Sequence, residues 1–501
     1  MTLKIFASKT ISDYLFVSVL ALVAVVIFNR SPVLITLLTV GGVIIVFLFF
    51  KKPEYSVLFL AAILPFRDVH LFSVIYVKRI VIWGLFSYIL LRQFTLPQHH
   101  PSKNMRFFTQ ATIFFIMMIC VSLLKTASQL HTGFYMTIGT LKTTIIDHAL
   151  TVVEQILIVY IVYDLIRSLQ FVQWLFDVII TTSAIVAVLG LWQYVIGGTP
   201  DPVSFLFSPT LQFYGRATSV FLTPNSFGHF LATVIGIAFP LFLFGRISQK
   251  KRFFFLLPIL LLDSIALFVS FSRGGMLSLF WGIIIATLLY HVKICQRKLT
   301  WRMFTFILML VILVSLFISQ YELFLRYRFA SYSKGFDAAV VWLNTKSDAD
   351  RKYAAIKAIE TFLHNPLLGI GYDVYTNKNI AAGLGPDNQY LEILVNAGLL
   401  GFIPYMMMLA FVIKSGLRLW NKAYRDQIPF DIQIIMLCLL VGFNIICFSH
   451  LFAVTLYYRT ISGNLWLFTG AIFVLERHYL SQGSFPERQA LFSYTEDTPM
   501  T

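Results

Sequence analysis

The sequence predicts an all-α polytopic membrane protein, on the evidence of its composition and its charge pattern. Of the 501 residues, 58% are hydrophobic and only 12% are charged, whereas a soluble domain carries about 25% charged residues. The mean hydropathy is +0.79. The lysines and arginines, which give a net charge of +16, gather in short loops between apolar runs. This distribution is typical of the cytoplasmic loops of membrane proteins and argues against nucleic-acid binding.

Fourteen apolar runs are candidates for membrane spans, since a helix needs about 20 residues to cross the hydrocarbon core. The run at 55–66 is short, and we expect a re-entrant segment or a half-span there, so the predicted total is 12–14 transmembrane helices. The runs lie near 11–29, 32–50, 55–66, 74–92, 107–124, 146–166, 172–196, 226–246, 253–271, 275–293, 303–320, 389–413, 431–451 and 458–476.

An even number of spans leaves both termini in the cytoplasm and places every basic loop on that same side. The first run is long for a signal peptide and is expected to remain as a span. The four cysteines show no CxxC spacing, so neither a disulfide framework nor a metal site is expected. The predicted organisation is N-terminal helices 1–166, central helices 167–320, an extracytoplasmic loop 321–388, C-terminal helices 389–476 and a cytoplasmic tail 477–501.

The long polar loop is predicted to contain an amphipathic helix from about Asp348 to His364. Acidic residues near its start favour a helix N-terminus, and the segment Asn365-Pro366 ends the pattern. Apolar residues recur at helical spacing between these signals, at Ile356, Ile359 and Leu363. We expect this apolar face to rest on the membrane-spanning helices.

Two arginines fall on the extracytoplasmic side of the predicted topology. Arg216 precedes a helix entrance at Pro224-Asn225, and Arg273 follows Ser272 in a glycine-containing turn between two spans. Guanidinium groups beside helix N-termini form an anion site that suits phosphate oxygens. The alternative is that each arginine only anchors its span or binds lipid headgroups at the interface.

The end of the long loop carries Asp387 and Asn388, immediately before a predicted span. Asp and Asn commonly cap helix N-termini. A carboxylate at this position could also serve as a general base toward an acceptor hydroxyl, and the two roles are compatible. His364 and His450 could supply an imidazole base instead, or serve structural roles.

These segments together resemble the O-antigen ligase/polymerase superfamily of bacterial surface-polysaccharide enzymes. The similarity runs from about 170 to 476. It rests on the order of four segments, which are Arg216…Pro224-Asn225, Ser272-Arg273-Gly274, Arg351…Asn365-Pro366-Leu367-Leu368-Gly369-Ile370-Gly371, and Asp387-Asn388-Gln389-Tyr390-Leu391…Gly398-Leu399-Leu400-Gly401.

The resemblance implies a glycosyltransferase of the C-type fold that works without a metal or other cofactor. Its donor would be an oligosaccharide on undecaprenyl diphosphate, at the outer face of the cytoplasmic membrane. Arg216 and Arg273 would hold the diphosphate, and Asp387 would be the base. Substrate-binding candidates are Asn225, Ser272, Arg351, Asn388 and His450. Implied partners are membrane lipids, a chain-length regulator and a flippase, and not nucleic acid.

One departure from the family pattern concerns the base. Ligases of this family typically have His-Asn where this chain has Asp387-Asn388. A carboxylate is a weak base unless its surroundings raise its pKa. The Asp-Asn pair looks more like the polysaccharide polymerases, so a polymerase is the leading hypothesis and a ligase the alternative. A transporter of lipid-linked sugars is disfavoured, because the sequence has no internal repeat and its distinctive polar residues fall on one side.

Overall fold

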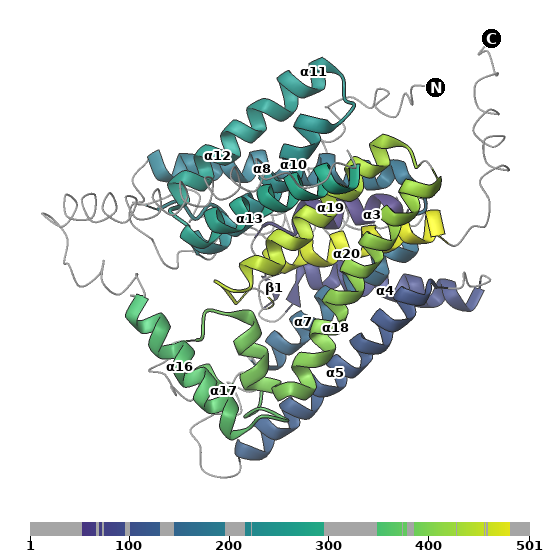
Figure 1. Cartoon of the computed structure of the whole chain (residues 1–501). Coiled ribbons are helices and arrows are strands. Elements are labelled where there is room, and N and C mark those ends of the chain that lie inside the picture. Colours follow the sequence, from purple (N-terminus) through teal and green to yellow (C-terminus); the bar gives the residue numbers. More distant parts are fainter. Residues whose placement is uncertain are drawn as a thin grey trace, which may run out of the picture.

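The computed structural model describes residues 53–66, 70–72, 75–95, 101–130, 145–195, 216–221, 223–294, 348–372, 374–377, 385–426, 428–454, 456 and 459–480 (Figure 1). Within these residues, eight helices are long and apolar enough to cross a membrane. The protein is an all-α polytopic membrane protein, as its composition predicts. The runs at 11–29, 32–50 and 303–320 lie outside the described residues, so the total of 12–14 spans stays a prediction.

The first of the described elements is a helix of ten residues, too short to span a bilayer alone, in the short apolar run 55–66. A two-stranded antiparallel hairpin follows it, which the sequence did not predict. These elements are α3 (Glu54–Ile63), β1 (His70–Phe72), β2 (Ile75–Tyr76), α4 (Val77–Thr95), α5 (Lys103–Leu130), α7 (Ile146–Leu165) and α8 (Leu169–Val195).

The helix α3 is short but firmly embedded. Eight of its ten residues are buried. The buried Lys78, from the start of α4, donates from its ammonium group to the main-chain carbonyls of Leu64 (3.0 Å) and Phe66, just beyond the end of α3. A cation at a helix C-terminus satisfies carbonyls that have no partner within the helix. This contact explains how the segment can end inside the protein.

The C-terminal elements include the longest helix among the described residues and the predicted loop helix. The segment 249–270 forms one span in which a π-helical turn (η2) connects α11 to α12. These elements are α10 (Pro224–Phe244), α11 (Gln249–Lys251), η2 (Arg252–Leu256), α12 (Leu257–Ser270), α13 (Arg273–Leu289), η3 (Tyr290–Ile294), α16 (Asp348–His364), α17 (Val374–Asn377), α18 (Gln389–Asp426), α19 (Phe430–Ser449) and α20 (Arg459–Leu480).

Ion pairs and charged hydrogen bonds join helix ends that the basic loops place on one side of the membrane. Lys251 of α11 contacts Asp177 in the third turn of α8 at 2.8 Å, and Arg92 of α4 contacts Asp164 near the end of α7 at 3.4 Å. Arg477 of α20 donates to main-chain carbonyls at the end of α7. We call this the basic end of the bundle. These contacts place the ends of α4, α7, α11 and α20 and the first turns of α8 in the same part of the bundle.

Candidate functional site

The helix α18 is interrupted where it begins its span, and the interruption is filled by another part of the chain. Gly398 has φ +63° and ψ −164°, a conformation outside the helical region. The main chain of residues 366–371 lies against this point and exchanges hydrogen bonds with residues 395–400. The four bonds run from Ile370 N to Val395 O (2.8 Å), Gly371 N to Asn396 O (3.3 Å), Leu399 N to Pro366 O (2.8 Å) and Leu400 N to Leu367 O (3.2 Å). Two of the segments that carry the family resemblance are therefore one interlocked unit.

The last turns of α5 hold this unit from the other side. Ser122 donates its hydroxyl to Asn396 O at 2.6 Å, and Thr126 donates to Tyr372 O at 3.1 Å. The ammonium group of Lys125 donates to Gly369 O. Figure 1 shows α5 and α18 side by side, with α16 and α17 near one end of this pair. The arrangement fixes the C-terminal half of the predicted loop on the membrane-spanning helices.

Arg216 bridges two helix ends at the opposite end of the bundle from the basic end. Its Nε donates to the carbonyl of Ser270 at 3.1 Å, and its Nη2 donates to the carbonyl of Phe271 at 3.0 Å and to Asn225 Oδ1 at 3.0 Å. Ser270 and Phe271 end α12, while Asn225 begins α10. The structure therefore joins Arg216, Asn225 and the turn that leads to Arg273, residues separated by up to 57 positions in sequence.

The α12–α13 turn is fixed by a cap and by close packing against α10. Ser272 is the N-cap of α13, and its hydroxyl accepts a hydrogen bond from Gly275 N at 3.1 Å. A Cβ built on Gly275 would lie only 2.7 Å from the main-chain carbon of Gly228, so the two helices touch through glycines. Arg273 is the first residue of α13 and is half-buried. Two helix N-termini and two arginines thus gather at this end.

Asp387 and Asn388, at the start of α18, make different side-chain contacts. Asn388 is the cap, because its Oδ1 accepts hydrogen bonds from Tyr390 N (2.9 Å) and Leu391 N (3.1 Å). The carboxylate of Asp387 lies 3.4 Å from Arg351 Nε, so this side chain also contacts the loop helix α16. The side chains of Arg351 and Asp387 are each about one third exposed. Asp387 has φ +48°, a left-handed conformation that Asp tolerates better than most residues.

His450 connects the start of α18 to the arginine-containing end of α10 and α13. Its carbonyl accepts a hydrogen bond from Gln389 N at 2.8 Å. Its side chain is fully buried, and its Nδ1 atom lies 3.1 Å from the hydroxyl oxygen of Tyr405. Two residues further on, Phe452 reaches α13, since a Cβ built on Gly274 would lie 3.1 Å from Phe452 Cβ. The end of α19 therefore stands between the two clusters. Burial in a wall of the site fits a structural role for this histidine.

The loop helix α16 has the predicted bounds, but a different face of it is packed. Ala354 and Ala358 are fully buried, and the Ala354 carbonyl accepts a 2.7 Å hydrogen bond from Tyr375 of α17. Ile356 and Ile359 are each 45% exposed, and Leu363 is 65% exposed. The expectation that these three rest on the membrane-spanning helices is wrong. Alanines permit the closer approach of α16 to its neighbours, so size and not hydrophobicity decides which face is buried.

Several residues that build the site carried no signal in the sequence. Lys125 is one of many lysines near a helix end, and Gln389 gives no hint that its Oε1 accepts a hydrogen bond from Leu456 N at 2.8 Å. Tyr405 lies in an apolar run that predicts only packing. His364, the other histidine considered as a base, ends α16 and is exposed. Partners that come from distant segments leave no local pattern.

A known protein family matches the part of the chain that contains most of this site. Residues 258–406 match a family model described as O-antigen ligase. This segment is an O-antigen ligase-like domain. It covers about 30% of the chain and runs from the second residue of α12 to the first half of α18. No curated protein matches the chain.

The O-antigen ligase-like domain contains Arg273, Arg351, Asp387 and Asn388, together with the interlocked segments around Gly398. The match confirms the superfamily that the four sequence segments indicate. Arg216 and His450 lie outside it, although both contact residues that flank or belong to it. The candidate site therefore also includes residues near α10, which precedes the domain in the sequence, and near α19, which follows it.

Proposed function

We propose that the protein is a membrane glycosyltransferase that polymerises undecaprenyl-diphosphate-linked oligosaccharide repeat units of a bacterial surface polysaccharide. The observation that carries the proposal is the pairing of two arginines with two helix N-termini at the end of the bundle that also holds Asp387. The match to the O-antigen ligase family supports glycosyl transfer as the reaction class, and the lipid-linked donor is part of the proposal.

The donor suits this end of the bundle because a diphosphate carries several negative charges. Arg216 and Arg273 would face these charges from two sides of the α12–α13 turn. The first turns of α10 and α13 add main-chain N–H groups and the positive ends of two helix dipoles. Arg216 is oriented by Asn225 and by two carbonyls, so its position does not depend on the ligand. Preorganised cations stabilise a departing diphosphate without a metal ion.

The proposed reaction moves one glycan from one lipid carrier to another. Asp387 accepts the proton of an acceptor hydroxyl, and the hydroxyl oxygen attacks the anomeric carbon of the donor sugar. The bond between that carbon and the diphosphate oxygen breaks, and undecaprenyl diphosphate leaves with the bonding electrons. The proton on Asp387 passes to solvent. Arg351 keeps the carboxylate in place through the 3.4 Å contact, on a helix that belongs to the extramembrane segment.

The proposed orientation follows from the separation of charge between the two ends. Lysines and arginines in short loops mark the cytoplasmic side of membrane proteins. The basic end, with Arg92, Lys251 and Arg477, would face the cytoplasm. The end with Arg216 and Asp387 would then open to the outer face of the cytoplasmic membrane, where lipid-linked repeat units are joined in this family.

The surface glycan of a deletion strain tests the proposed reaction. Single repeat units in place of long chains are expected of a polymerase. Complete chains retained on the undecaprenyl carrier would identify a ligase instead, the alternative that the family description favours. Unchanged glycan would refute both and return the transporter hypothesis.

Complementation of that strain with variants tests the site. Arg216→Ala and Arg273→Ala are each expected to abolish the polymer while the protein is still inserted in the membrane. Lys357→Ala is the matched control, since Lys357 is a similarly exposed cation on α16 that pairs with Glu360 on the same helix. Normal polymer from both arginine variants would refute the diphosphate-binding role.

A further inference from the structure

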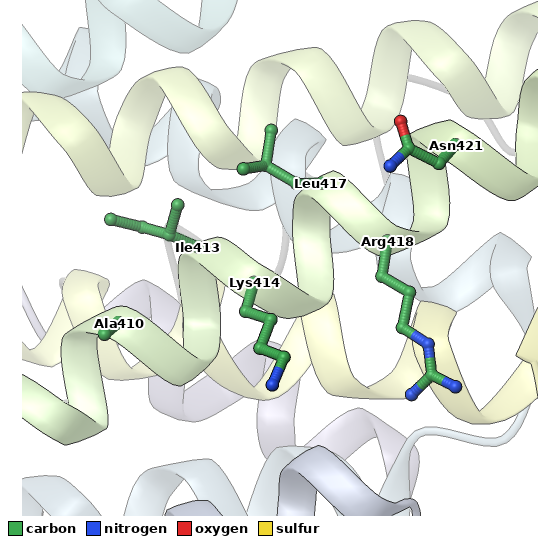
Figure 2. Close-up of a pocket in the computed structure, with 6 residues that line it drawn as sticks. All are labelled: Ala410, Ile413, Lys414, Leu417, Arg418 and Asn421. Atoms are coloured by element: carbon green, nitrogen blue, oxygen red, sulfur yellow. The ribbon is translucent and has the colours of Figure 1, made fainter.

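A shallow groove of about 430 Å³ runs along the second half of α18, far along the helix from the site at its start. The described residues that line it are Ala410, Ile413, Lys414, Leu417, Arg418 and Asn421 (Figure 2). Asparagine and the two cations supply its polar atoms, and the remainder is aliphatic. The groove lies on the part of α18 that leads to the basic end of the bundle.

The lining residues form two rows on the helix surface. Lys414 and Arg418 are four residues apart, and Figure 2 shows their side chains extending in the same direction from successive turns. Ile413 and Leu417 form the neighbouring row and are each 37% exposed. An apolar row beside a pair of cations matches a molecule with a hydrocarbon chain and an anionic head.

The surrounding charges leave the groove positive. Arg418 lies 4.0 Å from Glu476, at the limit of an ion pair. The fully buried Glu476 carboxylate is engaged more closely by Asn104 Nδ2 (2.8 Å) and the Ser415 hydroxyl (3.0 Å). The Arg418 side chain is 53% exposed, and Lys414 makes no ion pair with any residue of the described part of the chain.

We propose that this groove binds one anionic phospholipid of the surrounding leaflet. Its phosphate would lie between Lys414 and Arg418, and one acyl chain would follow Ala410, Ile413 and Leu417 toward the membrane interior. A lipid is favoured over a water-soluble anion because α18 is long and apolar enough to span the membrane, which places the aliphatic row against hydrocarbon. The site is independent of the glycan chemistry at the other end of the helix.

The test uses the full-length protein purified in a neutral detergent and titrated with defined lipids. Phosphatidylglycerol is expected to bind measurably by native mass spectrometry and to raise the temperature of unfolding, while phosphatidylcholine with the same chains does neither. The double variant Lys414→Gln, Arg418→Gln is expected to bind phosphatidylglycerol about 30-fold more weakly, from about 1 kcal/mol for each basic residue. Lys357→Gln, at an exposed position on α16, is the charge control and is expected to bind like the wild type.

A second variant keeps the proposal testable if the double variant does not fold. Ala410→Phe retains both cations and fills the aliphatic part of the groove, so it should weaken lipid binding without changing the charge. Equal binding of phosphatidylglycerol by the wild type and both variants would overturn the proposal. Stabilisation by glycerophosphoglycerol, which has the head without the chains, to the same extent as by the lipid would also overturn it, since a free phosphate site would then suffice.

Discussion

Replacement of Gly398 by alanine is expected to damage both the stability and the activity of the protein. Gly398 combines φ +63° with ψ −164°, a region that is essentially restricted to glycine. A Cβ added there would lie 2.2 Å from the carbonyl oxygen of Leu367 and 2.6 Å from the nitrogen of Leu368. Both are main-chain atoms, so neither can rotate away as a flexible side chain would.

The magnitude follows from two terms. Holding alanine in this backbone conformation costs about 1–3 kcal/mol. Relieving the overlap requires residues 366–371 to move away from α18, which strains or lengthens four main-chain hydrogen bonds. Overpacking of this kind costs about 1–3 kcal/mol. The expected loss is therefore about 2–6 kcal/mol. Activity should fall as well, because the same unit anchors the C-terminal end of α16, the helix whose first turn carries Arg351, the partner of Asp387.

The assay is the fraction of detergent-solubilised protein that remains monodisperse after heating, with glycan polymer in the complemented deletion strain as the second readout. Gly84→Ala is the matched control, since Gly84 is in the helix α4 and a Cβ there meets no atom within 4 Å. The control is expected to be neutral or stabilised by up to about 1 kcal/mol. If Gly398→Ala withstood heating as well as Gly84→Ala, the account of the interlocked unit would be wrong.

Substitutions at three further positions separate chemistry from packing. Asp387→Asn is expected to abolish polymer without lowering thermal stability, since Asn388 supplies the cap; full activity would remove Asp387 as the base. Asn388→Ala should cost about 1 kcal/mol of stability and Asn388→Asp much less, as judged by the same heating assay; equal stability of the two would contradict the capping role. Glu476→Ala should cost about 3 kcal/mol or more, because Asn104 and two serines would lose a buried charged acceptor. Glu476→Gln keeps an acceptor and should be milder, and an equal loss from both would refute this reasoning.

The sequence predicted the described helices well because apolar runs and basic loops are local signals. The spans α8, α10, α13 and α19 begin and end within a few residues of their runs, and the loop helix α16 has the predicted bounds. The hairpin of β1 and β2 was not predicted, because its residues continue into an apolar run that reads as helix.

The sequence suggested which residues belong to the candidate site, but not which of them contact one another. Glycines and an arginine in a turn suggested an anion site, and the structure joins Arg216 to that turn through Ser270 and Phe271. The partner of Asp387 could not be inferred, since Arg351 lies 36 positions earlier at the other end of a loop helix. Nor could the exposed face of α16 be foreseen, because helical periodicity identifies an apolar stripe but not what packs against it.

The contacts also explain why the site extends beyond the O-antigen ligase-like domain. The domain supplies the cap of α18 and the start of α13, but each depends on a helix outside it. Asn388 Nδ2 reaches the carbonyl of Leu451 at the end of α19, and Gly275 packs on Gly228 of α10. Changes that move α10 or α19 would therefore displace Arg216 and the start of α18 without altering any residue of the domain. The unit that must fold to bring Arg216, Arg273 and Asp387 to one end of the bundle runs from before α10 to beyond α19.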